Sequence, residues 1–220
     1  MTEAEWRGAV TPLGMLMLLD GRTSDRKFRL FACACCRRIW DRLTDGRSGA
    51  AVECAEHFAD GAASSAELRR HYFLARELSR NLFRADRADP TQYELLSAAD
   101  AAHHSAYSGA TSAALDAAWQ GVRGGLEPIR PDEQAIQAVM VRCIFGNPFR
   151  PTTFDPRWRT SDTVGLARGI YEEPTFDRLP LFGDALMDAG CDDEAILAHC
   201  RSEGPHVRGC WVVDLVLGKE

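Results

Sequence analysis

Lysine is nearly absent from this chain: Lys27 and Lys219 are the only lysines among 26 basic residues. A genome rich in G and C explains this bias more simply than selection for arginine chemistry. Long apolar runs are also missing, because no stretch reaches the roughly 18 residues that a membrane-spanning helix needs. The first residues, Met-Thr-Glu-Ala-Glu, are acidic and do not resemble a secretory signal. These absences favour a cytoplasmic protein without a membrane span.

The signatures of several common enzyme classes are missing as well. The chain has no Gly-x-Ser-x-Gly nucleophile elbow, no Walker A glycine loop and no Gly-x-Gly-x-x-Gly dinucleotide motif. Familiar hydrolase and nucleotide sites are therefore not expected. We assign no catalytic residue and favour a protein that is not an enzyme.

Strand signals are scarce, whereas helix signals recur along the whole chain. Thr2 with Glu5, and Ser64 with Glu67, have the spacing of capping boxes that open helices. Glycine and proline then divide the chain into short helical segments. We predict an all-α fold of about ten short helices in helical hairpins. Two packed parts, residues 1–125 and 126–220, are expected to meet near Gly121–Pro128. Expected helices include 24–43, 49–59, 65–85 and 192–200, with 210–217 as a helix or a strand.

Charge is distributed unevenly along the chain. The formal net charge is −6, yet residues 21–88 carry 14 basic against 9 acidic side chains. A basic segment on an acidic chain hints at an anionic partner, although a merely solvated surface explains it too.

The helix expected from residue 65, extended to 87, carries arginines and aromatic residues on one face. At 100° per residue this face lies opposite the stripe of Leu74, Leu78 and Leu82. Arginine mixed with aromatics is typical of protein interfaces and of grooves for single-stranded nucleic acid. The alternative is that a second helix covers the aromatics while the arginines reach water. The candidate partner-binding residues are Arg69, Tyr72, Phe73, Arg76, Arg80, Phe83, Arg84 and Arg87.

The last thirty residues concentrate cysteine and histidine. The candidate metal ligands are Cys191, Cys200, His206 and Cys210, with His199 as a spare. Four such ligands can close a structural zinc site. However, Cys191 and Cys200 flank an expected helix about 13 Å long, so one ion cannot reach both. We therefore favour buried thiols that act as small apolar side chains, and expect neither zinc nor another cofactor.

Two other arrangements were weighed as catalytic or metal sites. Cys33, Cys35 and Cys36 fall within a helix, where burial makes thiols inert. Asp100 and His103, together with Glu53 and His57, give only one weak variant of the paired motifs of di-metal bundles. For both groups of residues we favour an ordinary structural role over catalysis or metal binding.

The run from His206 to Asp214 is the most distinctive short motif. Arg208 and Asp214 are close enough in sequence to form a pair, with Trp211 over them. We interpret these three residues as a structural lock that seats the C-terminal helix, and a binding pocket is the alternative.

Four stretches together resemble a known family. They are Ser-Asp-Arg-Lys leading into Cys-Ala-Cys-Cys-Arg-Arg, then Phe-Gly-Asn-Pro-Phe-Arg-Pro, Asp-Ala-Leu with Ala-Gly-Cys, and His-Val-Arg-Gly-Cys-Trp. The chain resembles an uncharacterised, paralogue-rich family of planctomycete bacteria, described by repeat-companion or unknown-function labels. The resemblance implies a cytoplasmic module, an adaptor or a defence-related accessory rather than a housekeeping enzyme.

The sequence thus predicts a non-enzymatic protein-interaction or adaptor module, and another protein is the expected partner. One alternative is a nucleic-acid-associated subunit that uses the arginine-rich face of residues 65–87. The other is a metal-dependent helical-bundle enzyme.

Overall fold

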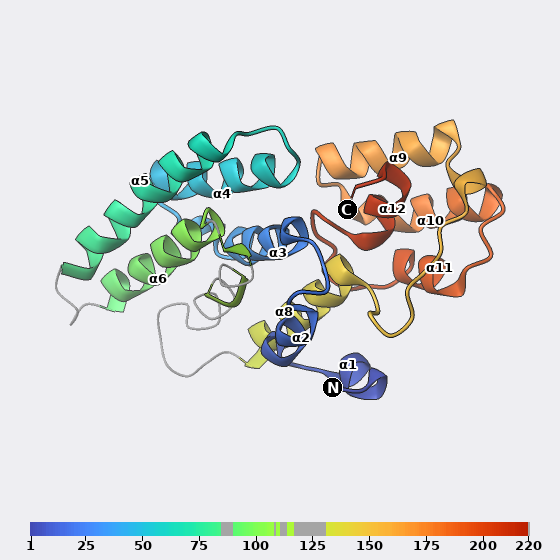
Figure 1. Cartoon of the computed structure of the whole chain (residues 1–220), viewed down its shortest axis with the longest axis horizontal. Helices are drawn as coiled ribbons and strands as arrows, with labels where there is room; N and C mark the ends of the chain where they lie inside the picture. Colours follow the sequence, from blue (N-terminus) through green and yellow to red (C-terminus); the bar gives the residue numbers. More distant parts are fainter. Residues whose placement is uncertain (85–89, 108, 111–113, 117–130, 220) are drawn as a thin grey trace. The chain divides into compact units, whose positions relative to one another are not determined.

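The computed structural model describes residues 1–84, 90–107, 109–110, 114–116 and 131–219. Within these ranges every regular element is a helix and none is a strand, which confirms the all-α prediction. None of the described helices is long and apolar enough to cross a membrane. The chain divides into two compact units, Met1–Ala138 and Val139–Glu220 (Figure 1). The boundary expected near Gly121–Pro128 lies outside the described residues.

The first unit is built from consecutive helical hairpins, in which α4, α5 and α6 lie side by side (Figure 1). Both predicted capping boxes are present: Glu5 N–H donates to Thr2 Oγ1, and Glu67 N–H donates to Ser64 Oγ. The elements are α1 (Glu3–Gly8), α2 (Pro12–Leu19), α3 (Asp25–Arg37), the 3-10 turn η1 (Trp40–Arg42), α4 (Gly46–Ala59), α5 (Ser65–Arg84), α6 (Pro90–Ser105) and the first half of α8 (Pro131–Phe145).

Two expected helix boundaries in this unit were wrong. The helix expected over 24–43 ends at Arg37, and the chain turns through η1. This turn stacks Trp40 on the Arg37 guanidinium, 4.0 Å from the ring centroid. The helix expected from residue 49 begins at Gly46, because the Asp45 side chain caps it by accepting from the backbone N–H of Arg47.

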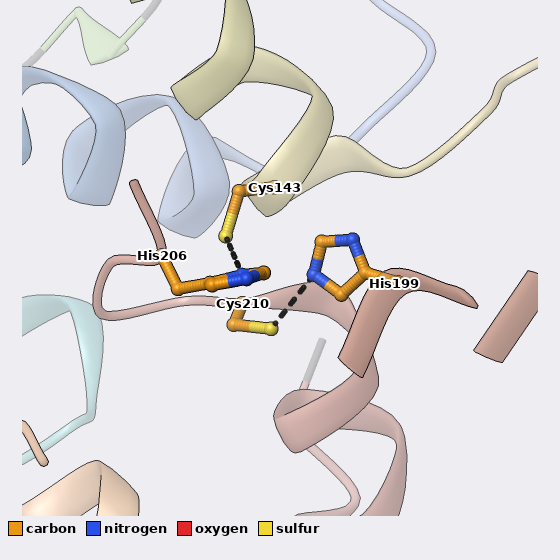
Figure 2. Close-up of side chains that lie close together, drawn as sticks. All are labelled: Cys143, His199, His206 and Cys210. Atoms are coloured by element: carbon orange, nitrogen blue, oxygen red, sulfur yellow. Dashed lines mark hydrogen bonds between the residues drawn. The ribbon is translucent and has the colours of Figure 1, made fainter. Parts of the chain in front are cut away.

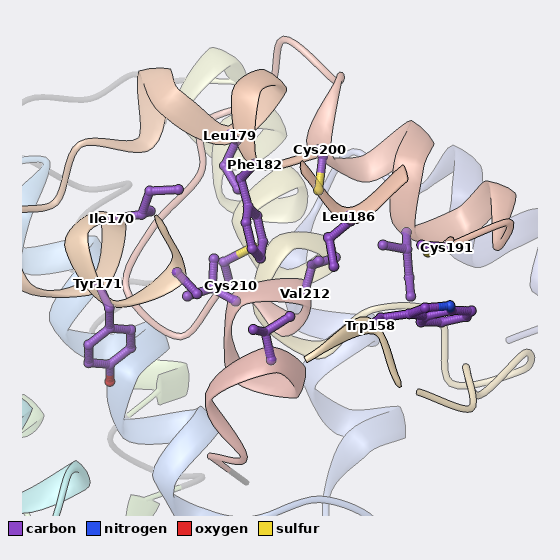
Figure 3. Close-up of a cluster of buried hydrophobic side chains, with 14 of the residues drawn as sticks. Trp158, Ile170, Tyr171, Leu179, Phe182, Leu186, Cys191, Cys200, Cys210 and Val212 are labelled. Carbon is purple, nitrogen blue, oxygen red and sulfur yellow. The ribbon is translucent and has the colours of Figure 1, made fainter. Parts of the chain in front are cut away.

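The second unit packs short helices around one core. After the second half of α8 come η2 (Pro156–Trp158), α9 (Ser161–Glu172), η3 (Phe176–Arg178), α10 (Leu179–Asp188), α11 (Glu194–Cys200) and α12 (Trp211–Leu217). The last segment is thus a helix, not a strand. Phe182 lies in the centre of the core, among Leu179, Cys210 and Val212 (Figure 3).

The proline-rich segment before α9 anchors this core. Trp158 is buried, and its indole N–H donates to the carbonyl of Gly190 at 3.0 Å. The neighbouring Arg159 donates to the carbonyls of Leu215 and Val216, both at 2.8 Å. These carbonyls belong to the last turn of α12, so Arg159 satisfies acceptors that a helix end leaves open.

Two helical glycines should respond to alanine in opposite ways. A Cβ on Gly183 would lie 2.8 Å from Cys200 Cβ, whereas a Cβ on Gly165 would meet nothing within 4 Å. We expect Gly183→Ala to destabilise the second unit by about 1–3 kcal/mol through overpacking. Gly165→Ala should stabilise it by about 0.5–1 kcal/mol through reduced backbone entropy. Urea unfolding measures both, and equal effects would contradict this packing of α10 on α11.

His103 should make the first unit less stable in acid. Burial is the main cause that lowers its pKa from 6.5 to about 4, and the nearby His104 adds to it. Asp100 Oδ1 lies 3.7 Å from Nδ1, too far for a compensating hydrogen bond. Between pH 6.5 and 4 the unfolded chain therefore binds a proton that the folded chain does not. The free energy of unfolding should fall as pH drops through this window.

The variant His103→Phe keeps an aromatic ring against Tyr72 and removes the titration. Its urea midpoint should depend less on pH between 7 and 5 than that of the wild type. His57→Gln, at an exposed position of α4, is the control and should keep the wild-type dependence. A His103→Phe profile parallel to the wild type would contradict a neutral, buried His103.

Candidate functional site

Two thiols and two imidazoles converge in the second unit (Figure 2). One donor atom from each of Cys143, His199, His206 and Cys210 lies within 4.8 Å of all the others. We call these four residues the Cys/His cluster. Both cysteines are buried, and both histidines are partly buried. Among the described residues, this is the one group of three or more potential metal ligands that assembles.

Three separate parts of the chain deliver these side chains. Cys143 lies in the last turn of α8, and His199 lies in the last turn of α11. His206 and Cys210 come from the segment between α11 and α12, where Cys210 occupies the position just before α12. This segment turns at Gly209, whose φ of 88° is a left-handed conformation that glycine adopts without strain.

Hydrogen bonding determines which nitrogen of His206 faces the cluster. Nε2 lies 3.0 Å from the backbone carbonyl of Ser202, which can only accept a hydrogen bond. Nε2 therefore carries a proton, and Nδ1 faces Cys143 Sγ at 3.6 Å. An imidazole whose second nitrogen donates to a backbone carbonyl is the usual arrangement of a metal-ligating histidine.

The spacing of the donors fits a tetrahedral metal ion. Zinc bound by two sulfurs and two nitrogens places its ligand atoms about 3.3–3.8 Å apart, from bond lengths of about 2.3 and 2.0–2.1 Å. The Cys143 Sγ–His206 Nδ1 distance is 3.6 Å, and the His199 Nε2–Cys210 Sγ distance is 3.2 Å. Because all four donor atoms lie within 4.8 Å of one another, the widest pair needs to close by about 1–1.5 Å. Two thiolates with two imidazoles in a tetrahedron are typical ligands of Zn²⁺.

The two thiols of the cluster differ in acidity. Burial raises the pKa of Cys143 well above its usual value, and the neighbouring Cys210 raises it further. Burial also acts to raise the pKa of Cys210, but its contacts with Cys143, His199 and His206 outweigh burial and hold that pKa well below its usual value. Cys210 is therefore the more acidic thiol of the pair.

The sequence identified only part of the cluster. His206 and Cys210 were candidate ligands, and His199 was the spare. Cys143 was missed, because it lies far from the others in sequence within an ordinary helical pattern. Cys200 and Cys191 do not join them: Cys200 packs near Gly183 in the core, and Cys191 lies in the same core near Trp158 (Figure 3). The sequence-based argument against zinc assumed that Cys191 and Cys200 would both be ligands. It does not apply to the four residues that the structure brings together.

The residues of the expected C-terminal lock lie beside this cluster. Asp214 is buried, and the Arg208 guanidinium stacks over the Tyr171 ring at 4.4 Å. Trp211 is only partly buried, and its ring lies 5.3 Å from that of His199 between centroids. The pairing of Arg208 with Asp214 remains a prediction.

The remaining catalytic and metal candidates lie in the first unit. Cys33, Cys35 and Cys36 are fully buried, and burial raises the pKa of each thiol well above its usual value. Such thiols are poor nucleophiles. Asp100 accepts a hydrogen bond from Ser79. Among the described residues, His103 and Asp100 do not form a metal-binding group with Glu53 and His57, which are both exposed on α4.

The arginine and aromatic residues of α5 differ in exposure. Phe73 and Phe83 are each 54% exposed, so the described helices do not cover them. Arg69 and Arg80 are exposed, and the Arg76 guanidinium lies 5.8 Å from the centroid of the partly buried Tyr72 ring. Arg84 is the last residue of α5, and Arg87 lies outside the described residues.

Comparison with known proteins gives no match: no protein-family model, no curated protein and no solved structure is similar to this chain.

Trp211 should stabilise the second unit from beside the Cys/His cluster. Its ring packs against Gly146, where an added Cβ would be 3.5 Å away. Because the ring is only partly buried, we expect Trp211→Ala to cost about 2 kcal/mol, less than the loss of a fully buried tryptophan. Trp211→Phe should cost less than half as much. Chemical denaturation measures both, and an unchanged midpoint for Trp211→Ala would contradict this packing.

Proposed function

We propose that this chain is a non-enzymatic interaction module whose C-terminal unit is held together by one structural zinc ion. The observation that carries the proposal is the convergence of the four donor atoms within 4.8 Å. The ion would join the end of α8, the end of α11 and the start of α12. Structural zinc sites contribute directly to folding, since the unfolded chain does not hold the ligands together.

The number of ligands favours a structural over a catalytic role. Catalytic zinc sites usually have three protein ligands and a fourth position for water or substrate. Here four protein donors would close the tetrahedron, and two of them come from buried cysteines. A metal-dependent enzyme is thus the less favoured alternative.

The exposed arginine and aromatic side chains of α5 support an interaction role. In the first unit, α5 presents Phe73 and Phe83 to solvent, each 54% exposed. Exposed aromatics among arginines are enriched where proteins bind one another. Adaptors need such a surface and no reactive group.

Zinc content tests the proposal. Protein purified without chelator should contain about one zinc per chain by elemental analysis. Cys210→Ser and His206→Ala should each reduce this to well under half, because three ligands hold zinc much less tightly. Cys191→Ala is the matched control, since this buried cysteine is not part of the cluster, and it should keep its zinc.

A fourth variant separates loss of a ligand from loss of the fold. His206 faces the cluster through Nδ1, which is bonded to Cγ, so the sulfur of a cysteine at this position reaches a similar place. His206→Cys should therefore retain zinc, because three cysteines and one histidine are also a common structural set. Wild-type protein with well under one zinc, or full zinc in Cys210→Ser, would refute the site.

A further inference from the structure

A pocket of 590 Å³ opens between α3, α4, α5 and the residues after α6 in the first unit. Its lining combines cations with aromatic rings: Arg29, Phe58, Arg69, Tyr72, Phe73 and Tyr107. This volume is in the range of ligand pockets, which are mostly apolar with a few polar groups that fix orientation. Asp25 is the one acidic residue among the described residues of the lining.

Arg29 places a buried positive charge in this lining. The residue is 3% exposed, and Nη1 donates to the carbonyls of Ser105 at 3.1 Å and Tyr107 at 2.7 Å. Its guanidinium also lies over the Phe58 ring, 5.1 Å from the centroid. No carboxylate of the described residues forms an ion pair with it. Two neutral carbonyls, a ring and the nearby Asp25 carboxylate, which forms no ion pair with Arg29, only partly compensate this buried charge, so an anion bound here would be favoured.

The entrance adds a second cation. Arg69 is exposed and forms no ion pair with any described residue. Arg26, in contrast, is held by Asp60 at 3.3 Å. The pocket therefore offers the exposed Arg69 to an anionic group, and the buried charge of Arg29 lies in its wall.

The aromatic side chains form a continuous surface at the same place. Tyr72 makes an edge-to-face contact with Phe73 at 5.2 Å and lies 5.6 Å from Tyr107, measured between ring centroids. Along α5 the surface continues through Arg76 and Arg80 to Phe83. Ten residues separate Phe73 from Phe83, which is about 15 Å along a helix.

We infer that this pocket and the adjoining face of α5 bind an acidic, aromatic-containing peptide segment of a partner protein. An aromatic side chain of the segment fills the pocket against Tyr72 and Phe73, and neighbouring carboxylates face Arg29 and Arg69. A surface that extends about 15 Å beyond one pocket suits an extended chain rather than a small metabolite.

Fluorescence anisotropy tests this inference with the full chain. The probe is a short fluorescein-labelled peptide in which two phenylalanines are spaced among aspartates and glutamates. Arg69→Glu should weaken its binding by about tenfold or more, since a favourable charge contact becomes repulsive. Arg70→Glu is the matched control, because Arg70 is the next exposed arginine on α5 but does not line the pocket. It should change affinity by less than about twofold, because its contribution is long-range and screened.

Two further arms identify what is recognised. Phe73→Ala should weaken binding of the peptide, and replacing the two phenylalanines of the probe by alanine should have a comparable effect. A labelled thymidine oligonucleotide should bind more weakly than the peptide at the same salt concentration. Equal affinities of Arg69→Glu and Arg70→Glu, tighter binding of the oligonucleotide, or no binding of the peptide would each overturn the inference. Because all variants lie in the first unit, their outcome is independent of zinc content.

Discussion

The convergence of four donor atoms from α8, α11 and the α11–α12 segment is the constraint on which the second unit depends. Two buried thiols and two partly buried imidazoles meet at this point. An apolar core does not need such polar groups. Mutual hydrogen bonds satisfy them in part, as the contacts between Cys143 and His206 and between His199 and Cys210 show. A tetrahedral metal ion would satisfy all four at once, and would fix the ends of two helices and the start of a third.

The apolar core and the Cys/His cluster join different parts of this unit. Phe182, Leu186 and Val212 belong to one apolar core, and Arg159, from the segment before α9, donates to the carbonyls at the end of α12. The loop between α11 and α12 has fewer buried apolar side chains, and it is the loop that supplies His206 and Cys210. Short units gain most from such a link, because a small core leaves little surplus stability.

Much of the fold could be predicted because its signals are local. The capping boxes at Thr2 and Ser64, and the left-handed Gly190 after α10, depend on residues three or four apart. The early end of α3 could not be predicted, since it depends on the packing of Trp40 against Arg37.

The cluster shows the same limit: His206 and Cys210 are close in sequence and were recognised, whereas Cys143 joins them only through the tertiary fold. Helical periodicity placed Phe73 and Phe83 among the arginines of α5 but left open whether another helix covers them. The buried Arg29 near the same surface lies on another helix, α3.

The most direct test of a structural zinc ion is the X-ray absorption spectrum at the zinc edge of the purified protein. A site formed by Cys143, His199, His206 and Cys210 predicts two sulfur neighbours at about 2.3 Å and two nitrogen neighbours at about 2.0–2.1 Å. A first shell of oxygen and nitrogen without sulfur, or an octahedral shell, would show that any zinc present is bound elsewhere and would contradict the account.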